Sequence, residues 1–258
     1  MLLTVDIGNS HTVIGTFQKD TLIAHWRLKT DRKITSDEIS ASLFGLLAMK
    51  KMTFREINGF IVACVVPQVL SSWLEFAAGI VDNPLQVDEI SDTGITVVTD
   101  NPAEVGADRI VNAAAAFAKY VSALVIVDFG TAITFDCVSG KGEYLGGAIA
   151  PGLGISLEAL GEQTAKLPRV DISSPPKNAI GTNTIEAIKS GILFGYGSMV
   201  DGLIEKICLE FSPEIPKVIA TGGMAPLIAR YSSSIEAIDP HLTLQGLALL
   251  YKRIYPNG

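Results

Sequence analysis

Paired cysteines and clustered histidines, which build disulfide frameworks and zinc sites, are missing from this sequence. The cysteines are odd in number and lack C-x-x-C spacing, and each has apolar neighbours; they are Cys64, Cys137 and Cys208. The histidines are equally dispersed, at His11, His25 and His241. We therefore expect buried, reduced thiols in a cytoplasmic protein, and no zinc or haem site.

Basic clusters and long apolar runs are also lacking. Twenty Lys and Arg residues stand against 27 Asp and Glu, and no Lys/Arg cluster is longer than Lys50-Lys51. The net charge of −7 disfavours nonspecific binding to nucleic acid or to an acidic membrane surface. No apolar run reaches the ~18 residues of a membrane span. The opening MLLTVD lacks a basic segment and is too short for a signal-peptide core. These features predict a cytoplasmic protein without membrane contact.

The chain does have enough apolar residues for one large or two modest domains, with 48% hydrophobic and 18% charged residues among 258. Apolar periodicity predicts alternating strands and helices. We expect strands within 2–17, 21–30, 59–67, 94–100, 123–138 and 217–221, and helices within 35–52, 69–78, 101–120, 182–211 and 243–254. The glycines within 182–211 indicate either one helix packed closely against another helix or subunit, or two shorter helices with a break.

An internal repeat divides the chain near its middle. Placing Val5–Phe17 over Val127–Ser139 aligns Asp6 with Asp128, Gly8 with Gly130 and Thr12 with Thr134, an offset of 128 − 6 = 122. Each copy has the form strand, Asp-x-Gly turn, strand. The repeat predicts two related α/β lobes that begin with the same unit.

These turns have two interpretations. Gly-Asn suits a tight hairpin turn, and Asp and Ser hydrogen-bond turn backbone. Alternatively, two glycine-rich turns that face each other would clamp a phosphate chain with backbone N–H groups. Their aspartates would then hold the accompanying cation, since Mg²⁺ is commonly bound by one or two carboxylates plus substrate phosphates.

Two further segments have a functional pattern. TGGMAP, residues 221–226, places glycines where a strand leads into a helix, so that a flat ligand such as adenine could approach the backbone, although a plain turn explains it nearly as well. EVGADR places Asp108 and Arg109 at a helix start. Asp is common there as a cap, but the adjacent Arg, which can grip a carboxylate or phosphate, favours a substrate site.

Seven segments together resemble the type III pantothenate kinase family, a member of the actin and sugar-kinase superfamily. In order along the chain they are DIGNS, CVVP, NPAEVGADRIVNA, VDFGTAITFD, GGAIAPGL, IGTNTIEAIKSG and TGGMAPL. The resemblance runs from Asp6 to the C-terminus. It implies an α/β fold of two related lobes of the actin-like, sugar-kinase (ribonuclease H-like) type with an ATP cleft between them, which we place at 1–118 and 119–258.

The resemblance also implies an activity, the ATP-dependent phosphorylation of pantothenate to 4′-phosphopantothenate, the first step toward coenzyme A. It implies Mg²⁺ with ATP, a monovalent cation (K⁺ or NH₄⁺) and a homodimer. The alternatives are another small-molecule kinase of the superfamily and a non-catalytic nucleotide-binding regulator.

Site residues follow from the resemblance by position. The implied ATP-binding residues are Asp6, Ile7, Gly8, Asn9, Ser10, His11, Thr12, Val13 and Thr131, with Asp6 beside Mg-ATP and Asp128 on the monovalent cation. The implied pantothenate-binding residues are Gly106, Ala107, Asp108, Arg109 and Thr184, with Asp108 as the catalytic proton acceptor. By itself, His11 is typical of a loop position. Ser10, Thr99 and Thr182 depart from residues common in the family, and the last two affect the expected pantothenate contacts.

Overall fold

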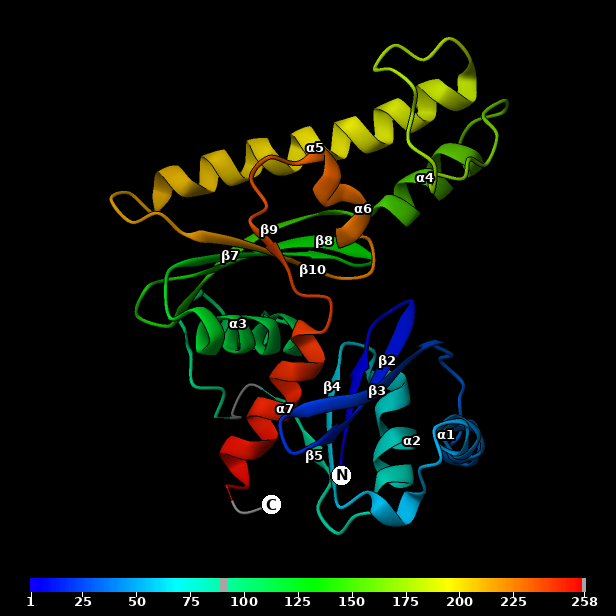
Figure 1. Cartoon of the computed structure of the whole chain (residues 1–258), viewed down its shortest axis with the longest axis vertical. Helices are drawn as coiled ribbons and strands as arrows, with labels where there is room; N and C mark the ends of the chain where they lie inside the picture. Colours follow the sequence, from blue (N-terminus) through cyan, green and yellow to red (C-terminus); the bar gives the residue numbers. More distant parts are fainter. Residues whose placement is uncertain (89–91, 257–258) are drawn as a thin grey trace. The chain divides into compact units, whose positions relative to one another are not determined.

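A computed structural model describes residues 1–88 and 92–256 of the chain. The chain divides into two compact units, Met1–Ala115 with Leu242–Gly258 (unit 1) and Ala116–His241 (unit 2). Each unit contains a sheet with helices packed on it (Figure 1). The expected α/β class is confirmed. The change of unit between Ala115 and Ala116 lies three residues from the boundary drawn at 118/119, and the C-terminal segment is part of unit 1.

Unit 1 is built on a five-stranded sheet in the order β3-β2-β1-β4-β5. Its strands are β1 (Leu2–Ile7), β2 (His11–Gln18), β3 (Thr21–Lys29), β4 (Gly59–Cys64) and β5 (Leu85–Gln86). β1 to β3 form an antiparallel meander, while β4 runs parallel to β1 and β5 parallel to β4. The carboxyl ends of the three parallel strands therefore meet at one edge of the sheet.

Helices cover both faces of this sheet. Side chains of β1 such as Leu3 and Val5 pack with α1 (Ser36–Met49) and α2 (Pro67–Ala78). On the opposite face, Ala63 of β4 packs with α3 (Ala107–Tyr120) and α7 (Leu242–Ile254). Gly246 of α7 lies so close to Val111 that a Cβ would stand 2.6 Å from its carbonyl oxygen. The last helix thus completes the core of unit 1.

In unit 2, five strands are hydrogen-bonded in the order β11-β10-β7-β8-β9. They are β7 (Leu124–Phe129), β8 (Ala132–Val138), β9 (Glu143–Pro151), β10 (Lys217–Thr221) and β11 (Ala237–Ile238). One face packs against α5 (Thr184–Glu210) and α6 (Ala225–Ile228), while α4 (Leu153–Glu162) packs on α5. Of the strand expected at 94–100, which belongs to unit 1, only β6 (Thr96–Val97) forms.

Helix α5 is continuous over 27 residues, so the two-helix alternative is wrong. Of its glycines, Gly197 has the close packing that was expected, because a Cβ there would stand 2.1 Å from the carbonyl oxygen of Tyr231. At Gly191, Gly195 and Gly202, no described atom outside the helix's own nearby backbone lies within 4 Å of a Cβ position. Packing inside the unit therefore explains one of these glycines.

The three cysteines are free thiols, and Cys137 is buried as expected. The expectation of burial is wrong for Cys64 and Cys208, which are half-buried because one ends a strand and the other lies in the last turns of α5. Across residues 1–88 and 92–256, no helix combines the length and apolar character that a membrane span requires.

Candidate active site

The repeated unit forms the same hairpin in both units, but with a one-residue difference in register. In unit 1, Asp6 lies opposite Val13 and Ile7 opposite Thr12. In unit 2, Asp128 lies opposite Thr134 and Phe129 opposite Ile133. The proposed equivalence of Thr12 with Thr134 is therefore wrong, because a one-residue shift moves a strand side chain to the other face.

The register differs because the second turn is one residue shorter. The Gly8 amide donates to the His11 carbonyl over 3.0 Å, whereas the Gly130 amide donates to the Ala132 carbonyl over the same distance. The alignment of Asp6 with Asp128 and of Gly8 with Gly130 survives this change, since each aspartate is the penultimate residue of the first strand and each glycine directly follows that strand. Thr134, rather than Ile133, consequently shares the face of Asp128.

Asp6 emerges on the sheet face that α3 covers. It is in register with Ala63 of the parallel strand β4, and Ala63 packs against α3 and α7. Partners in register point to the same side of a sheet, so Asp6 shares that face with α3, whose second residue is Asp108. Within unit 1, the first turn and the EVGADR segment are therefore brought to the same side of the sheet.

The residue that joins these two parts is Val65, directly after β4. Its amide donates to the Ile7 carbonyl over 3.0 Å, and its side chain would stand 3.6 Å from a Cβ placed on Gly106. A Cβ on Gly106 would also stand 2.6 Å from Oδ1 of Asp108, so a side chain at this position would displace the carboxylate. The strand end of Asp6 and the helix start of Asp108 thus share a neighbour.

The start of α3 holds the carboxylate of Asp108 in place. The Arg109 amide donates to Asp108 Oδ1 over 2.8 Å and to the Gly106 carbonyl over 3.0 Å. Gly106, Ala107, Asp108 and Arg109 are all half-buried. Both charged side chains therefore combine a fixed backbone position with access from solvent, which suits binding and proton transfer.

The side chains of the first turn divide into two groups. Ile7 is fully buried and Thr12 is 3% exposed, so these two would meet a ligand only through their backbone. Asn9 and His11 are exposed, while Gly8, Ser10 and Val13 are half-buried. His11 Nδ1 lies 3.0 Å from Nη2 of Arg27. Although His11 is exposed, slight desolvation of its ring, and then the charge of Arg27, lower its pKa and favour its neutral form.

A thiol lies near Asp6. Cys64 donates to the Val66 carbonyl over 3.2 Å and accepts from the Val66 amide over 3.4 Å. Burial raises the pKa of the Cys64 thiol; its contact with the Val66 backbone opposes this, and the negative charge of Asp6 adds a smaller upward effect. The thiol therefore stays protonated and braces the turn after β4.

In unit 2, the candidate residues centre on Asp128. It is in register with Thr221 of β10 and opposite Thr134 of β8, so a threonine lies beside it on each neighbouring strand. The Thr134 hydroxyl donates to Asp136 Oδ2 over 2.8 Å, which leaves its oxygen lone pairs available to a cation. Gly222 follows with a φ of +89°, and a Cβ there would stand 2.3 Å from Asp128 Oδ1. The glycine of the TGG segment is thus required for a close approach to this carboxylate.

Thr131 belongs to the same part of unit 2. Its carbonyl accepts from the Gly152 amide over 3.1 Å, and a Cβ on Gly152 would collide with the carbonyls of Gly130 and Thr131. The turn after β7, the start of α4 and the TGG loop therefore pack at one end of the unit 2 sheet.

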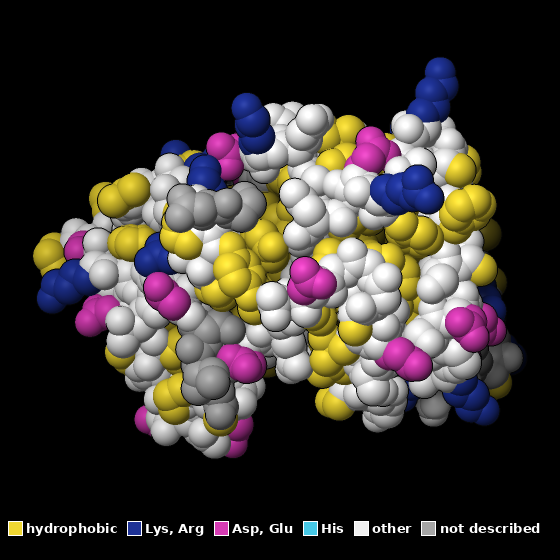
Figure 2. Space-filling view, turned by 90° about the horizontal axis from the view of Figure 1, so that it is seen from below, with side chains coloured by type: hydrophobic (Ala, Val, Ile, Leu, Met, Phe, Trp, Pro, Cys, Tyr) yellow, Lys and Arg dark blue, Asp and Glu magenta, His cyan; other side chains and the backbone are white. Residues whose placement is uncertain are grey.

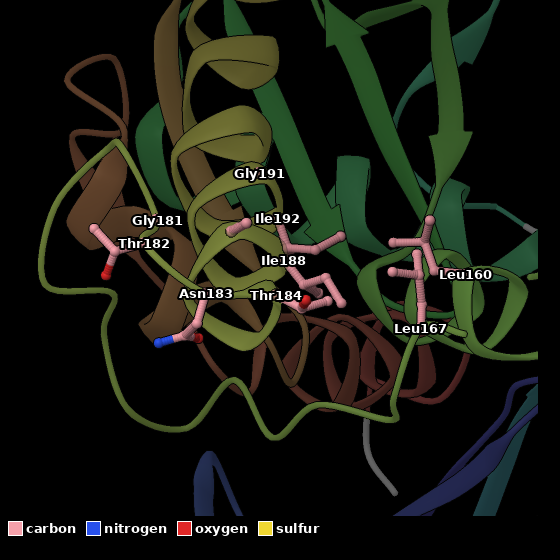
Figure 3. A pocket seen from close by; sticks show the side chains of 10 residues that line it. Leu160, Leu167, Gly181, Thr182, Asn183, Thr184, Ile188, Gly191 and Ile192 are labelled. Atoms are coloured by element: carbon pink, nitrogen blue, oxygen red, sulfur yellow. The ribbon is translucent and has the colours of Figure 1, made fainter.

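Thr184 lies apart from Asp128 and Thr131, in a hollow of about 640 Å³. Figure 3 shows Leu160 and Leu167 on one side, with Ile188 and Ile192 of α5 pointing toward them and Thr184 in the first turn of the helix. Asn183 caps this helix by accepting from the Glu186 amide over 3.0 Å. Neither Asp128 nor Thr131 lines the hollow.

The net charge of −7 gives an anion little general attraction to this protein. On the face shown in Figure 2, basic side chains lie singly among acidic ones. Within the described part of the chain, no three His, Cys, Asp or Glu side chains are grouped as a metal cage. A single carboxylate beside a glycine turn is still compatible with Mg²⁺, which keeps several waters and takes further ligands from substrate phosphates.

Comparison with known proteins identifies the family. A model of the type III pantothenate kinase family matches residues 2–206. The type III pantothenate kinase of Desulfatibacillum aliphaticivorans is 46% identical over 98% of this chain and 99% of its own length. That of Desulforapulum autotrophicum is 48% identical over 97% and 96%.

Among solved structures, the polyphosphate/ATP-glucomannokinase of an Arthrobacter species superposes with a TM-score of 0.51 at 16% identity, over 98% of this chain and 99% of that one. This likeness shows a shared fold, and the fold is of the expected sugar-kinase type. The family match covers most of the sequence, and the relatives are similar along their whole length. The chain belongs to the type III pantothenate kinase family.

Proposed function

We propose that the protein transfers the γ-phosphoryl group of ATP to the hydroxyl of pantothenate that becomes the 4′-phosphate, at the start of coenzyme A synthesis. Family membership supports this reaction. The structural observation that supports it best is the placement of Asp6 and Asp108 on one face of the unit 1 sheet. A metal-side carboxylate and a carboxylate that accepts the proton of the attacking hydroxyl are recurring parts of phosphoryl transfer to an alcohol.

Asp108 takes the proton from the attacking hydroxyl. Its carboxylate is held by the Arg109 amide and remains half-buried, which keeps one oxygen oriented and the group accessible. Arg109 would pair with the carboxylate of pantothenate, because a guanidinium binds a carboxylate through two parallel hydrogen bonds. Gly106 and Ala107 would allow the substrate to approach the helix start.

The turn from Asp6 to Val13 would hold the phosphates of ATP, with Asp6 beside the Mg²⁺ that ATP carries. Bound Mg²⁺ would neutralise charge that develops on the transferred phosphoryl group. Thr131 would contact ATP from unit 2. The TGG segment, with Gly222 held close to Asp128, would leave room for the nucleotide.

Asp128 would help to hold a monovalent cation, K⁺ or NH₄⁺. The donor set fits such an ion, since a carboxylate flanked by threonines on both neighbouring strands offers oxygen ligands without a tight octahedral cage. Units 1 and 2 would each supply one turn for the phosphates of ATP. Free thiols suit the reducing cytoplasm, in which we place this reaction.

The active unit is proposed to be a homodimer, with Thr184 of one copy completing the pantothenate site of the other. Gly191, Gly195 and Gly202 lie along one side of α5, and no described neighbour outside the helix fills the space above them. Ile180 and Ile185, close to Thr184, are 83% and 48% exposed. A helix of a second copy would cover this apolar, glycine-bearing side.

Mixing two inactive variants tests the dimer. Asp108→Asn and Thr184→Arg should each be inactive alone, but a mixed dimer would contain one intact site. Random pairing of equal amounts makes half of the dimers mixed, so refolding them together should restore about a quarter of the wild-type activity. Activity would be followed by ADP release, and light scattering would give the mass of each sample. No rescue, or a monomer at assay concentration, would contradict the proposal.

The substrate is tested by measuring ADP release with pantothenate and, separately, with several hexoses. We expect turnover with pantothenate to exceed that with any sugar by about 10²-fold or more, because a missing polar contact in the transition state costs at least that in a hydrogen-bonding site. Equal ADP release with every acceptor, or with none added, would overturn the proposed reaction.

A further inference from the structure

Thr30, the residue that follows β3, is joined to the first turn by three hydrogen bonds. Its Oγ1 donates to the Gly8 carbonyl over 2.7 Å, and its amide donates to the Ser10 carbonyl over 3.0 Å. Oγ1 also lies 3.0 Å from Oγ1 of Thr12. Thr30 is 9% exposed, so these bonds are shielded from water.

The direction of the hydroxyl chain follows from the number of protons. A threonine hydroxyl has one proton to donate. Thr30 uses it on the Gly8 carbonyl, which can only accept, so Thr12 must donate to Thr30. The two buried hydroxyls thus form a chain in which Thr12 donates to Thr30, and Thr30 donates to the Gly8 carbonyl of the turn.

Fixing this carbonyl also fixes the following N–H group. In a planar trans peptide the carbonyl and the next N–H point in opposite directions. Because the Gly8 oxygen points at Thr30, the Asn9 amide must point away from Thr30 and from the chain of hydroxyls. An oriented amide in a glycine turn is the kind of donor that binds a phosphate oxygen.

We propose that Thr30 is a positioning residue for the phosphates of ATP, acting through the Gly8–Asn9 peptide without touching the nucleotide. The inference rests on the proposed assignment of residues 6–13 as the phosphate turn. Without the hydroxyl, the Gly8 carbonyl loses a buried donor and the peptide plane is free to rotate. The binding free energy of ATP would then be reduced by the cost of orienting the Asn9 amide.

The test replaces the hydroxyl by a methyl group of similar size. Thr30→Val should raise the KM and the Kd for ATP by about tenfold, the effect of one buried hydrogen bond. The KM for pantothenate and kcat should stay within about threefold, since the acceptor side is not in contact with Thr30. Thr30→Ser retains the hydroxyl and should restore the KM for ATP to within about twofold of wild type.

Thr16→Val is the matched control. Thr16 is also buried, and its Oγ1 donates to the Ala24 carbonyl over 3.4 Å. Thr16 lies in the same β2–β3 hairpin as Thr12, but at the end remote from the Gly8–Ser10 turn. The Thr16→Val variant should be less stable than wild type, with an unchanged KM for ATP. Should Thr30→Val not fold, Thr30→Ala, which removes the hydroxyl together with the γ-methyl group and adds no atom, is assayed in the same way.

Asp6→Asn distinguishes a failure of the Thr30 proposal from a failure of the phosphate-turn assignment. If it raises the KM for ATP and folded Thr30→Val does not, the inference about Thr30 is wrong while the phosphate turn stands. If neither variant changes the KM for ATP, the assignment of the turn itself fails. A rise in both substrates' KM values, or an equal effect of Thr16→Val, would show a merely structural role and overturn the proposal.

Discussion

Asp108→Asn is expected to lower kcat by about 10² to 10⁴-fold, the usual contribution of a general base. The substitution leaves an amide oxygen that can still accept from the Arg109 amide, so the start of α3 should keep its conformation. The variant loses only the ability to take a proton from the attacking hydroxyl. Its Kd for ATP, measured by calorimetric titration, should therefore remain near the wild-type value.

Glu104→Gln is the matched control for this experiment. Glu104 is exposed, lies in the short helix Pro102–Glu104 just before the same segment, and accepts from Asn101 Nδ2 over 2.8 Å. Its substitution removes one negative charge close to Asp108 without touching the proposed base, and turnover should be unchanged. Equal kcat values for Asp108→Asn and wild type would refute the assigned role, and an equal loss in Glu104→Gln would point to general electrostatics.

The parts of the site that could be predicted from the sequence are those with a local signal. The Asp-x-Gly turns between β-formers, and an Asp-Arg pair at a helix start, are each contained in a few neighbouring residues. Their elements form where expected, with β1 and β7 ending beside Asp6 and Asp128 and α3 beginning at Ala107. Short-range turn and capping chemistry determines these features.

Contacts between distant residues could not be read in the same way. The pairing of Thr30 with Gly8, the position of Val65 against Gly106 and the approach of Gly222 to Asp128 each depend on tertiary packing. The register of the second hairpin is a subtler case, because a turn one residue shorter leaves the aspartates aligned and moves the following threonine to the other face. Internal similarity alone does not reveal such a shift.

Potassium or ammonium should raise turnover about tenfold or more over sodium at matched ionic strength, if a weakly hydrated cation sits at Asp128. ATP phosphates and this carboxylate together gather negative charge, and neither turn contains a lysine. Asp128, the penultimate residue of β7, lies in register between Thr134 and Thr221, and a large ion would be shared with them through oxygen ligands at flexible distances. The alternative, an aspartate that merely stabilises its turn, predicts no dependence on the cation.

Asp128→Asn should therefore weaken the activation and the binding of ATP together, because an amide oxygen carries no full charge to balance the ion. Glu214→Gln is the control, since it removes one charge from an exposed side chain near Gly140, at the other end of the β7–β8 hairpin. It should keep the full response to potassium. Initial rates over a range of potassium concentrations would give the activation constant of each variant. Equal turnover of the wild-type protein in sodium and potassium would show that the cation assignment to Asp128 is wrong.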